Sequence, residues 1–247
     1  MGESKLEVKL VAHTPNPEHL IADNARLCYA NNENAEKLFG KERDSKDDAR
    51  MIKILADMKH MSPFEHVNYS FEITGISRVT SHQLVRHRLA SYSQRSQRYV
   101  KHDKEFQYIV PPSIKEAELT ERYLEMMKTI RKFYEELSLG LEKSGIQGEE
   151  KNQDARYVLP NACETKIGVT MNARELLHFF QERLCNRAQW EIRKMAEKMF
   201  ELVYPTAPNV FSYAGPSCVS EGRCHQGKKG CGKMKEKNEY FEKIKNL

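Results

Sequence analysis

The chain has 247 residues, of which 39% are hydrophobic and 30% are charged, so it is long enough for one sizeable core or two small ones and is not disordered. The net charge of +5 is too small to indicate a general polyanion binder. No apolar run approaches the roughly 20 residues of a membrane helix, and residues 1–9 lack the apolar segment of a signal peptide. We therefore expect a cytoplasmic protein with no membrane partner, whose six cysteines are reduced thiols.

Hydrophobic periodicity along the chain predicts both strands and helices. Alternating apolar residues predict strands over residues 5–13, 68–74 and 165–171, and residues 99–110 are expected to be extended. Helical spacing predicts helices over residues 17–30, 45–58, 75–88, 116–141, 148–159 and 187–204, with a further helix that begins at Asn172. The polar residues 31–46 are expected to form a loop or lid, and the chain after Pro205 reads as loop-like, then cysteine-rich, then lysine-rich.

The long predicted helix over residues 116–141 carries one continuous apolar stripe. The members of that stripe are Leu119, Tyr123, Met126, Ile130, Phe133, Leu137 and Leu141. We interpret it as a surface for core or subunit packing and not as a ligand site.

The basic segment formed by residues 86–98 is the strongest functional signal in the sequence. It contains Arg86, Arg88, Arg95 and Arg98 together with serine and glutamine side chains, and no Asp or Glu occurs from residue 73 to residue 102. Guanidinium, hydroxyl and amide groups at this density suit an anionic ligand that accepts many hydrogen bonds, such as a nucleotide phosphate. The alternatives are a solvated basic surface or a nucleic-acid-binding module, since tyrosines are interleaved with the charges.

No Gly-x-Ser-x-Gly elbow and no glycine-rich phosphate loop is present, so side chains must hold any nucleotide. Asn172 is a suitable N-cap, with Glu175 three residues later. Arg174 and His178 are four residues apart and share a helix face, which is either a ligand-binding face or a solvated one. His60 precedes Pro63, and we expect it to face a turn or a ligand and not a metal.

The C-terminal segment contains a possible zinc-ligand set. Its members are Cys218, Cys224, His225 and Cys231. Three thiols and one imidazole could form a tetrahedral site, but the spacing lacks a Cys-x-x-Cys pair. We therefore expect simple thiols here and no bound metal.

The basic segment and several other parts of the chain resemble a known family. Arg86-His87-Arg88, seven further residues and Ser96 resemble the signature of the flavin-dependent thymidylate synthases. The likeness continues in segments 25–29, 63–66, 156–160, 172–174 and 188–191, and it spans roughly residues 5–213. We accordingly divide the chain into a synthase domain of residues 1–213 and a Cys/Lys-rich tail of residues 214–247.

The resemblance implies a fold and a reaction. The fold would be α/β, a compact sheet with packed helices that assembles as a homotetramer whose active sites are shared between subunits. The reaction would be the reductive methylation of dUMP to dTMP, in the biosynthesis of thymidylate. The carbon donor would be 5,10-methylenetetrahydrofolate, and FAD reduced by NADPH would supply the hydride. No nucleic-acid partner is expected.

The resemblance also implies a role for individual residues. Arg183 would be the catalytic side chain, near the uracil ring, with an ion pair to Glu182 or Glu191 as its alternative. FAD would be bound by Ser62, Arg86, His87, Arg88, Gln94, Asn172, Arg174 and His178. The substrate dUMP would be bound by Gln83, Arg86, Gln94, Arg95, Ser96, Gln97, Arg98, Arg156 and Arg183. His60 would stack beside the flavin and folate rings. The chain departs from the family at Gln94, His178 and Arg187, where Glu, Asn and His respectively are common.

Overall fold

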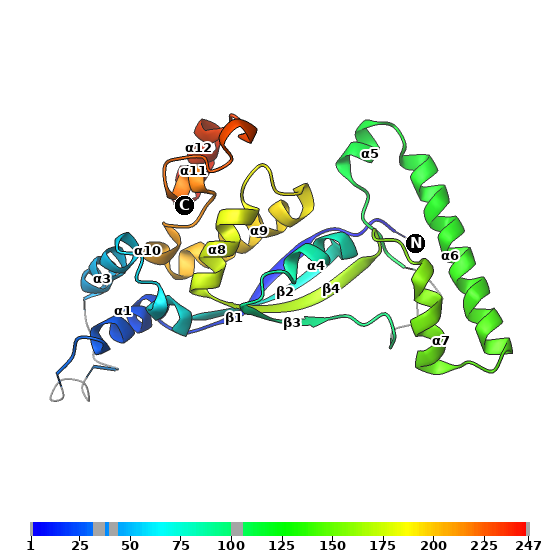
Figure 1. The fold of residues 1–247 in the computed structure, drawn as a ribbon, viewed down its shortest axis with the longest axis horizontal. Coiled ribbons are helices and arrows are strands. Elements are labelled where there is room, and N and C mark those ends of the chain that lie inside the picture. The colour runs from blue at the N-terminus through cyan, green and yellow to red at the C-terminus, as the bar shows by residue number, and fades with distance from the viewer. Residues whose placement is uncertain (1, 32–37, 40–43, 100–105, 246–247) are drawn as a thin grey trace. The chain divides into compact units, whose positions relative to one another are not determined.

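The computed structural model describes residues 2–31, 38–39, 44–99 and 106–245, and the chain folds into two units (Figure 1). The first unit contains residues 1–7, 73–85 and 92–168. The second unit contains residues 8–72, 86–91 and 169–247. The basic segment is therefore divided, because Arg86, His87 and Arg88 belong to the second unit and residues 92–98 belong to the first.

A four-stranded sheet supplies strands to both units, in the order β1-β2-β4-β3. The strands are β1 (Glu7–His13), β2 (Asn68–Ser77), β3 (Ala90–Gln94) and β4 (Glu164–Asn172). The Ser70 and Thr170 hydroxyls lie 2.9 Å apart, and the Gly75 N–H donates to Glu164 Oε1 at 3.2 Å. Because residue numbers fall along β4 as they rise along β2, the two central strands are antiparallel.

The structure confirms the predicted strands and corrects the prediction for residues 75–88. Tyr69, Phe71 and Ile73 are buried along β2 as their alternation predicts. The helix predicted over residues 75–88 is wrong in its first part, because β2 continues to Ser77. Gly75 has φ +70°, and a Cβ there would lie 1.9 Å from the Lys5 carbonyl oxygen, so only glycine fits this strand position. The strand β3 within the basic segment was not predicted.

The second unit packs its helices around a cluster of aromatic side chains. These elements are α1 (Pro17–Leu27), α3 (Ser45–Asp57), η1 (Ser62–His66), α8 (Ala173–Arg183), α9 (Trp190–Val203), η3 (Tyr204–Thr206), α10 (Pro208–Phe211), α11 (Ser217–Ser220), η4 (Gly227–Lys229) and α12 (Met234–Lys245). Phe200 contacts both Phe180 and Phe241, with ring centroids 5.6 Å and 5.1 Å apart. Helix α12 is thus anchored through buried Phe241, in a segment where only a lysine-rich composition was recognised. The proposed domain boundary after residue 213 stays a prediction.

The first unit has a smaller core and a long exposed helix. Its helices are α4 (Arg78–Leu84), α5 (Pro112–Glu116), α6 (Thr120–Lys143), α7 (Gly148–Ala155) and η2 (Arg156–Val158). The core contains Phe106, Tyr108, Val110, Met127 and Cys163. In helix α6 only Met127 and Tyr134 are buried, whereas Met126 and Phe133 of the predicted stripe are 54% and 49% exposed. Tyr123 and Ile130 of the stripe do pack against this core, so the interpretation as core packing is correct for part of the stripe, whereas Met126 and Phe133 stay exposed within one chain.

Two predictions fall largely outside the described residues: the polar loop over 31–46, and the central part of the extended segment over 99–110. In the part of the chain that the structure describes, no helix is both long and apolar enough to cross a membrane.

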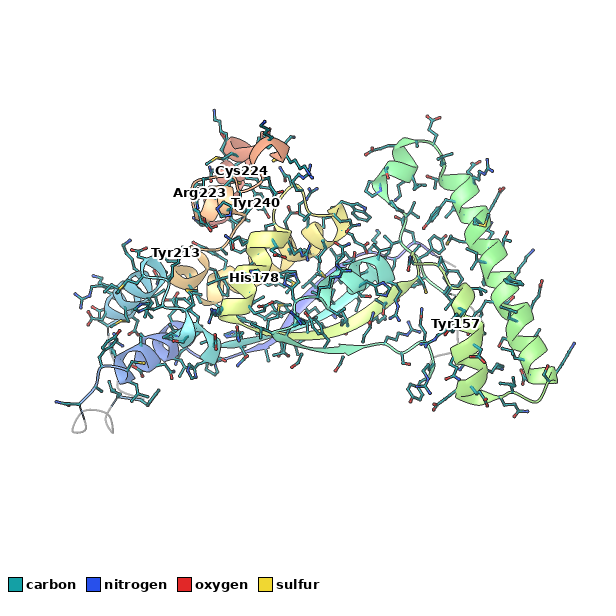
Figure 2. The ribbon with its side chains drawn as sticks, viewed as in Figure 1. Tyr157, His178, Tyr213, Arg223, Cys224 and Tyr240 are labelled. Carbon is teal, nitrogen blue, oxygen red and sulfur yellow. The ribbon has the colours of Figure 1, made fainter. Side chains whose placement is uncertain are left out.

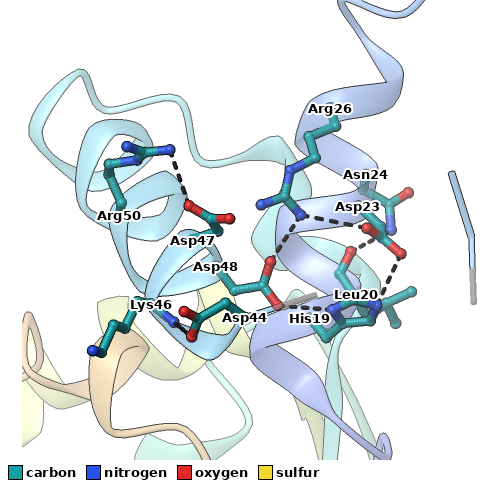
Figure 3. A network of polar contacts seen from close by, with 10 residues as sticks. All are labelled: His19, Leu20, Asp23, Asn24, Arg26, Asp44, Lys46, Asp47, Asp48 and Arg50. Atoms are coloured by element: carbon teal, nitrogen blue, oxygen red, sulfur yellow. Dashed lines mark hydrogen bonds and ion pairs between the residues drawn. The ribbon is translucent and has the colours of Figure 1, made fainter. Parts of the chain in front are cut away.

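A buried ionic network joins α1 to α3 (Figure 3). Asp48 accepts hydrogen bonds from Arg26 Nη1 at 2.8 Å and from His19 Nδ1 at 2.7 Å. Asp23 lies 3.5 Å from the same arginine nitrogen. Asp23 and Asp48 are 1% and 4% exposed, so these contacts replace the hydration that both carboxylates lose on burial.

We predict that Asp48→Ala destabilises the protein by about 2 kcal/mol or more, because it leaves Arg26 and His19 partly buried without their shared acceptor. The matched control is Asp47→Ala, which removes an exposed ion pair with Arg50 and should change stability by less than about 0.5 kcal/mol. Urea denaturation of both variants measures the difference. Equal effects of the two substitutions would contradict a stabilising role for the network.

Candidate functional site

His87 is the buried centre of the basic segment in the second unit. It is 4% exposed, whereas Arg86 and Arg88 on either side of it are exposed. Its ring packs edge-on against Phe179 of α8, with centroids 4.9 Å apart. This contact fixes the backbone of the Arg-His-Arg segment on α8 and leaves both flanking guanidinium groups accessible to a ligand.

Both ring nitrogens of His87 contact charged side chains of α8. Arg183 Nε donates a hydrogen bond to His87 Nε2 at 3.0 Å. Glu175 Oε1 lies 3.3 Å from His87 Nδ1. An arginine N–H can only donate, so Nε2 is the acceptor and the proton resides on Nδ1, facing the glutamate. The arrangement requires a neutral imidazole.

The pKa of His87 is lowered from 6.5 to about 4, chiefly by burial and further by the positive charge of Arg183. Burial also raises the pKa of Glu175. The neutral imidazole is therefore retained at physiological pH, and it can accept the hydrogen bond that orients the guanidinium of Arg183.

The helix α8 places these groups by its periodicity. Glu175, Phe179 and Arg183 are four residues apart in succession and lie on one face, on which His87 is seated. Asn172 caps the helix by accepting from the Glu175 N–H at 2.8 Å, as predicted. The carboxylate of Glu175 faces His87, a role that the sequence did not reveal.

Arg183 keeps part of its guanidinium available. Its side chain is 20% exposed, and Nη2 lies 3.6 Å from Glu182 Oε2. The ion pair with Glu182, which the sequence offered as the alternative for Arg183, is thus present beside the contact with His87. The side chains of Arg183, Glu182 and His178 line a cavity of about 440 Å³.

His178 and Arg174 occupy the neighbouring, exposed face of α8. Both line a second cavity of about 220 Å³, together with Met61, Leu177 and Tyr213. His178 and Tyr213 are labelled in Figure 2. Arg174 forms an ion pair with Glu65 of η1, the segment that begins with Ser62. His60 and Ser62 are exposed next to this turn.

The group formed by His87, His178 and Glu182 has its potential ligand atoms within 4.8 Å of one another, which is the spacing of a possible metal site. Nε2 of His87 already accepts the Arg183 hydrogen bond. A cation at this nitrogen would displace that bond and would lie against a guanidinium. We therefore interpret the group as part of the polar network around Arg183.

The first unit contains the remaining predicted residues. They are Gln83, Gln94, Arg95, Ser96, Gln97, Arg98 and Arg156. Gln94 Nε2 donates to the Thr165 hydroxyl at 3.1 Å, and Arg95 Nη1 lies 3.7 Å from Glu164 Oε2. The hydroxyl of Ser96 accepts from the Arg98 N–H at 3.1 Å, which closes a tight turn.

Two further contacts hold that turn. Asn152 Nδ2 donates to the Arg98 carbonyl at 2.9 Å, and Gln97 Nε2 donates to Cys163 Sγ at 3.7 Å. The guanidinium of Arg98 lies 5.7 Å from the Tyr99 ring centroid and 3.7 Å from Glu149. The arginines of this segment are thus presented from a backbone that neighbouring side chains fix.

Arg78 is a cation of the first unit that sequence reasoning missed. Burial lowers the pKa of Arg78, and the positive charge of Arg156 lowers it further, so the two guanidinium groups are near neighbours. Two adjacent guanidinium groups suit an anion such as phosphate. Its position within the acid-free stretch from residue 73 to residue 102 was the available signal.

The side chains of the second unit fit a flavin dinucleotide. Exposed guanidinium groups at Arg86, Arg88 and Arg174 suit a diphosphate, and the cavity at Met61, Leu177 and Tyr213 offers apolar surface to a ring.

We predict that His87 makes stability depend on pH. The folded state favours the neutral ring because the pKa of His87 is lowered there. The contribution of His87 to the free energy of unfolding is therefore complete above pH 6.5 and is lost as the pH falls from 6.5 towards 4. In His87→Gln the part of the loss of stability that is due to His87 should disappear. The other charged or titratable side chains around this position remain in the variant: Glu175, His178, Glu182 and Arg183. Urea unfolding at several pH values tests this, and parallel curves for the two proteins would contradict it.

Comparison with known proteins gives a consistent result. The family model described as "Thymidylate synthase complementing protein" matches residues 9–209. The flavin-dependent thymidylate synthase of Clostridium tetani is 46% identical, over 96% of this chain and 97% of the relative. That of Geobacter sulfurreducens is 44% identical, over 97% of this chain and 99% of the relative.

A solved structure shares the fold at lower sequence identity. The crystal structure of the UMP/dUMP methylase PolB from Streptomyces cacaoi, bound with 5-Br dUMP, matches with a TM-score of 0.70 and 23% identity. It covers 87% of this chain and 97% of its own. Together with the family match and the two relatives, this establishes that the chain belongs to the family of flavin-dependent thymidylate synthases.

Proposed function

We propose that this protein converts dUMP to dTMP by reductive methylation, with 5,10-methylenetetrahydrofolate as carbon donor and NADPH as reductant. Membership of the family supports the reaction. The observation that carries the assignment within the site is the hydrogen bond from Arg183 Nε to neutral His87, because it holds a permanent cation in one orientation beside a cavity.

The second unit would hold the cofactor FAD, which supplies the hydride when bound. Arg86, Arg88 and Arg174 would bind its diphosphate through guanidinium groups. Ser62, Asn172 and His178 would complete the site by hydrogen bonding, and we also assign Gln94 to FAD binding. Since both ring nitrogens of His87 are engaged, His87 would serve FAD by fixing the two arginines that flank it.

The first unit would hold the substrate. Arg95, Arg98 and Arg156 would bind the phosphate of dUMP, and we add Arg78 because of its proximity to Arg156. The turn closed by Ser96, with Gln97, would orient the nucleotide. Gln83, Gln94 and Arg86 would contact its remaining polar groups. His60 would stack against the flat rings of flavin and folate.

Arg183 would act on the uracil ring. A guanidinium stays positively charged throughout the pH range, so it can stabilise negative charge that develops on the ring during methylation. The bond from Nε to His87 fixes the guanidinium by its inner nitrogen, so the terminal nitrogens, of which Nη2 also lies 3.6 Å from Glu182 Oε2, would be the groups that approach the substrate. We infer that His87, held by Glu175, is a positioning residue for Arg183.

We further propose that four copies of the chain assemble and share their active sites. Four apolar side chains on α6 or next to it are between 48% and 58% exposed: Leu119, Met126, Phe133 and Leu139. Leu119, Met126 and Phe133 recur at intervals of seven residues, so they form one stripe along a helix. Such a stripe is suited to packing against a second copy.

To test the reaction, purified protein should be assayed for dTMP formation with FAD, NADPH, methylenetetrahydrofolate and dUMP. We predict that Arg183→Ala lowers kcat by about 100-fold or more, because a preorganised cation at the reacting ring is lost. The flavin absorbance of the variant should be retained. The control Arg50→Ala removes an exposed guanidinium on α3 and should keep normal turnover.

Near-normal turnover of Arg183→Ala would remove this side chain from the catalytic role. A wild-type protein that takes up no flavin and forms no dTMP would contradict the proposed reaction itself. Because flavin binding and turnover are measured separately, these two failures can be told apart.

The assembly is tested by the mass of the protein in solution. We predict that Phe133→Glu shifts the tetramer towards smaller species, because it places a charge within the exposed apolar stripe. Lys128→Glu introduces the same side chain on a different face of α6 and should leave the mass unchanged. Light scattering with size-exclusion chromatography measures both, and a wild-type monomer would overturn the proposal.

A further inference from the structure

The segment that joins α11 to α12 is ordered without a hydrophobic core. Residues 221–236 are all exposed, and no aliphatic or aromatic side chain occurs among them before Met234. The backbone nevertheless makes defined turns, with positive φ at Gly222, Gly227 and Gly232. Short segments that lack a core commonly obtain a fixed conformation from a crosslink or a bound metal.

Four cysteines gather around this segment. Cys185, just after α8, lines the same cavity as Ser217, and Cys218 follows Ser217 on α11. Asn186 follows Cys185 in the chain, and its Nδ2 donates to Cys231 Sγ at 3.7 Å. Cys231 therefore lies beside the neighbour of Cys185.

The fourth cysteine belongs to the same cluster. Gly230 precedes Cys231 in the chain and lies against Cys224, because a Cβ at Gly230 would be 3.4 Å from Cys224 Sγ. Cys224 also precedes His225, which lines the same cavity as Cys185 and Ser217. Four cysteines gathered at one place are the donor set of a structural zinc site, in which the cation offsets the charges of the thiolates.

The surroundings of Cys231 are those of a thiolate ligand. Gly232, with φ +73°, turns the chain so that the backbone N–H of Lys233 bonds to the Cys231 sulfur. The same sulfur accepts from Asn186. Donors aimed at a sulfur stabilise its anionic form and are typical of the groups that support a metal ligand. Nearby cations at Arg223, Lys228, Lys229 and Lys233 would offset the charge of a tetrathiolate site.

We propose that Cys185, Cys218, Cys224 and Cys231 bind one zinc ion. This revises our expectation of simple thiols, and it replaces His225 with Cys185 in the candidate set. The ring of His225 is engaged elsewhere, because its Nε2 lies 2.9 Å from Glu221 Oε2. Cys185 and Cys218 are 33 positions apart in the chain, so spacing alone could not associate them.

Binding must draw the four sulfurs together. Tetrahedral coordination at the usual Zn–S length places thiolates about 3.8 Å apart, and no three of these sulfurs lie within 4.8 Å of one another in the structure. Cys224 and Cys231 lie in the exposed segment without a core, which can move towards Cys185 and Cys218 without disrupting packing. The ion would then tie this segment to the C-terminal end of α8, two residues after Arg183.

The test is the metal content of the full-length protein, purified without chelators and measured by plasma mass spectrometry. We expect about one zinc ion per chain. Cys224→Ser and Cys231→Ser should each lose most of it, whereas the control Cys28→Ser, at an exposed cysteine on another part of the second unit, should retain it. Replacement of zinc by Co²⁺ in the wild-type protein should give the strong visible absorption of tetrahedral thiolate coordination.

A second variant tests the supporting contact. Asn186→Ala removes the donor to Cys231 and should weaken zinc affinity by about tenfold or more in competition with a chromophoric chelator. Wild-type protein that holds no zinc after incubation with the metal, that holds iron instead, or that keeps equal zinc in Cys224→Ser would overturn the proposal. None of these measurements depends on turnover.

Discussion

The hydrogen bond between Arg183 and the buried ring of His87 is the interaction on which the functional site depends. It exists only while the imidazole is neutral, and the pKa of about 4 for His87 ensures this in ordinary conditions. Burial against Phe179 lowers that pKa, and the Nδ1 contact with Glu175 sets the tautomer. A surface histidine in the same motif would be charged for part of the time and would repel the arginine.

The fold produces this arrangement by packing one short segment, residues 86–88, against helix α8. Helix α8 begins at a side-chain cap and buries Phe180 in the aromatic cluster with Phe200, so its position is fixed by packing. One face of the helix then holds His87, and the adjacent face presents Arg174 and His178 to cavities. The same packing exposes Arg86 and Arg88, and His87 also accepts the hydrogen bond from Arg183, so the anchoring of one residue positions three guanidinium groups.

Sequence reasoning found much of this site but not its internal contacts. The Arg-His-Arg motif and the start of α8 at Asn172 were predictable, since both depend on local residue patterns. The role of Glu175 was not, because its carboxylate faces a residue 88 positions away, where a local capping role was expected. Likewise the backbone of Lys5 approaches β2 so closely at Gly75 that no side chain fits there, and α12 is held by Phe241 against Phe200. These are long-range constraints that periodicity does not report.

The central claim, that this chain methylates dUMP in a flavin-dependent reaction, is tested most directly by release of tritium from dUMP labelled at carbon 5 of the uracil ring. Methylation replaces the label on that carbon, so tritium must enter water. With FAD, NADPH and methylenetetrahydrofolate present, we expect release that matches dTMP formation, and we expect none when FAD is withheld from the apoprotein. Release that is independent of FAD, or its absence from the complete mixture, would contradict this account.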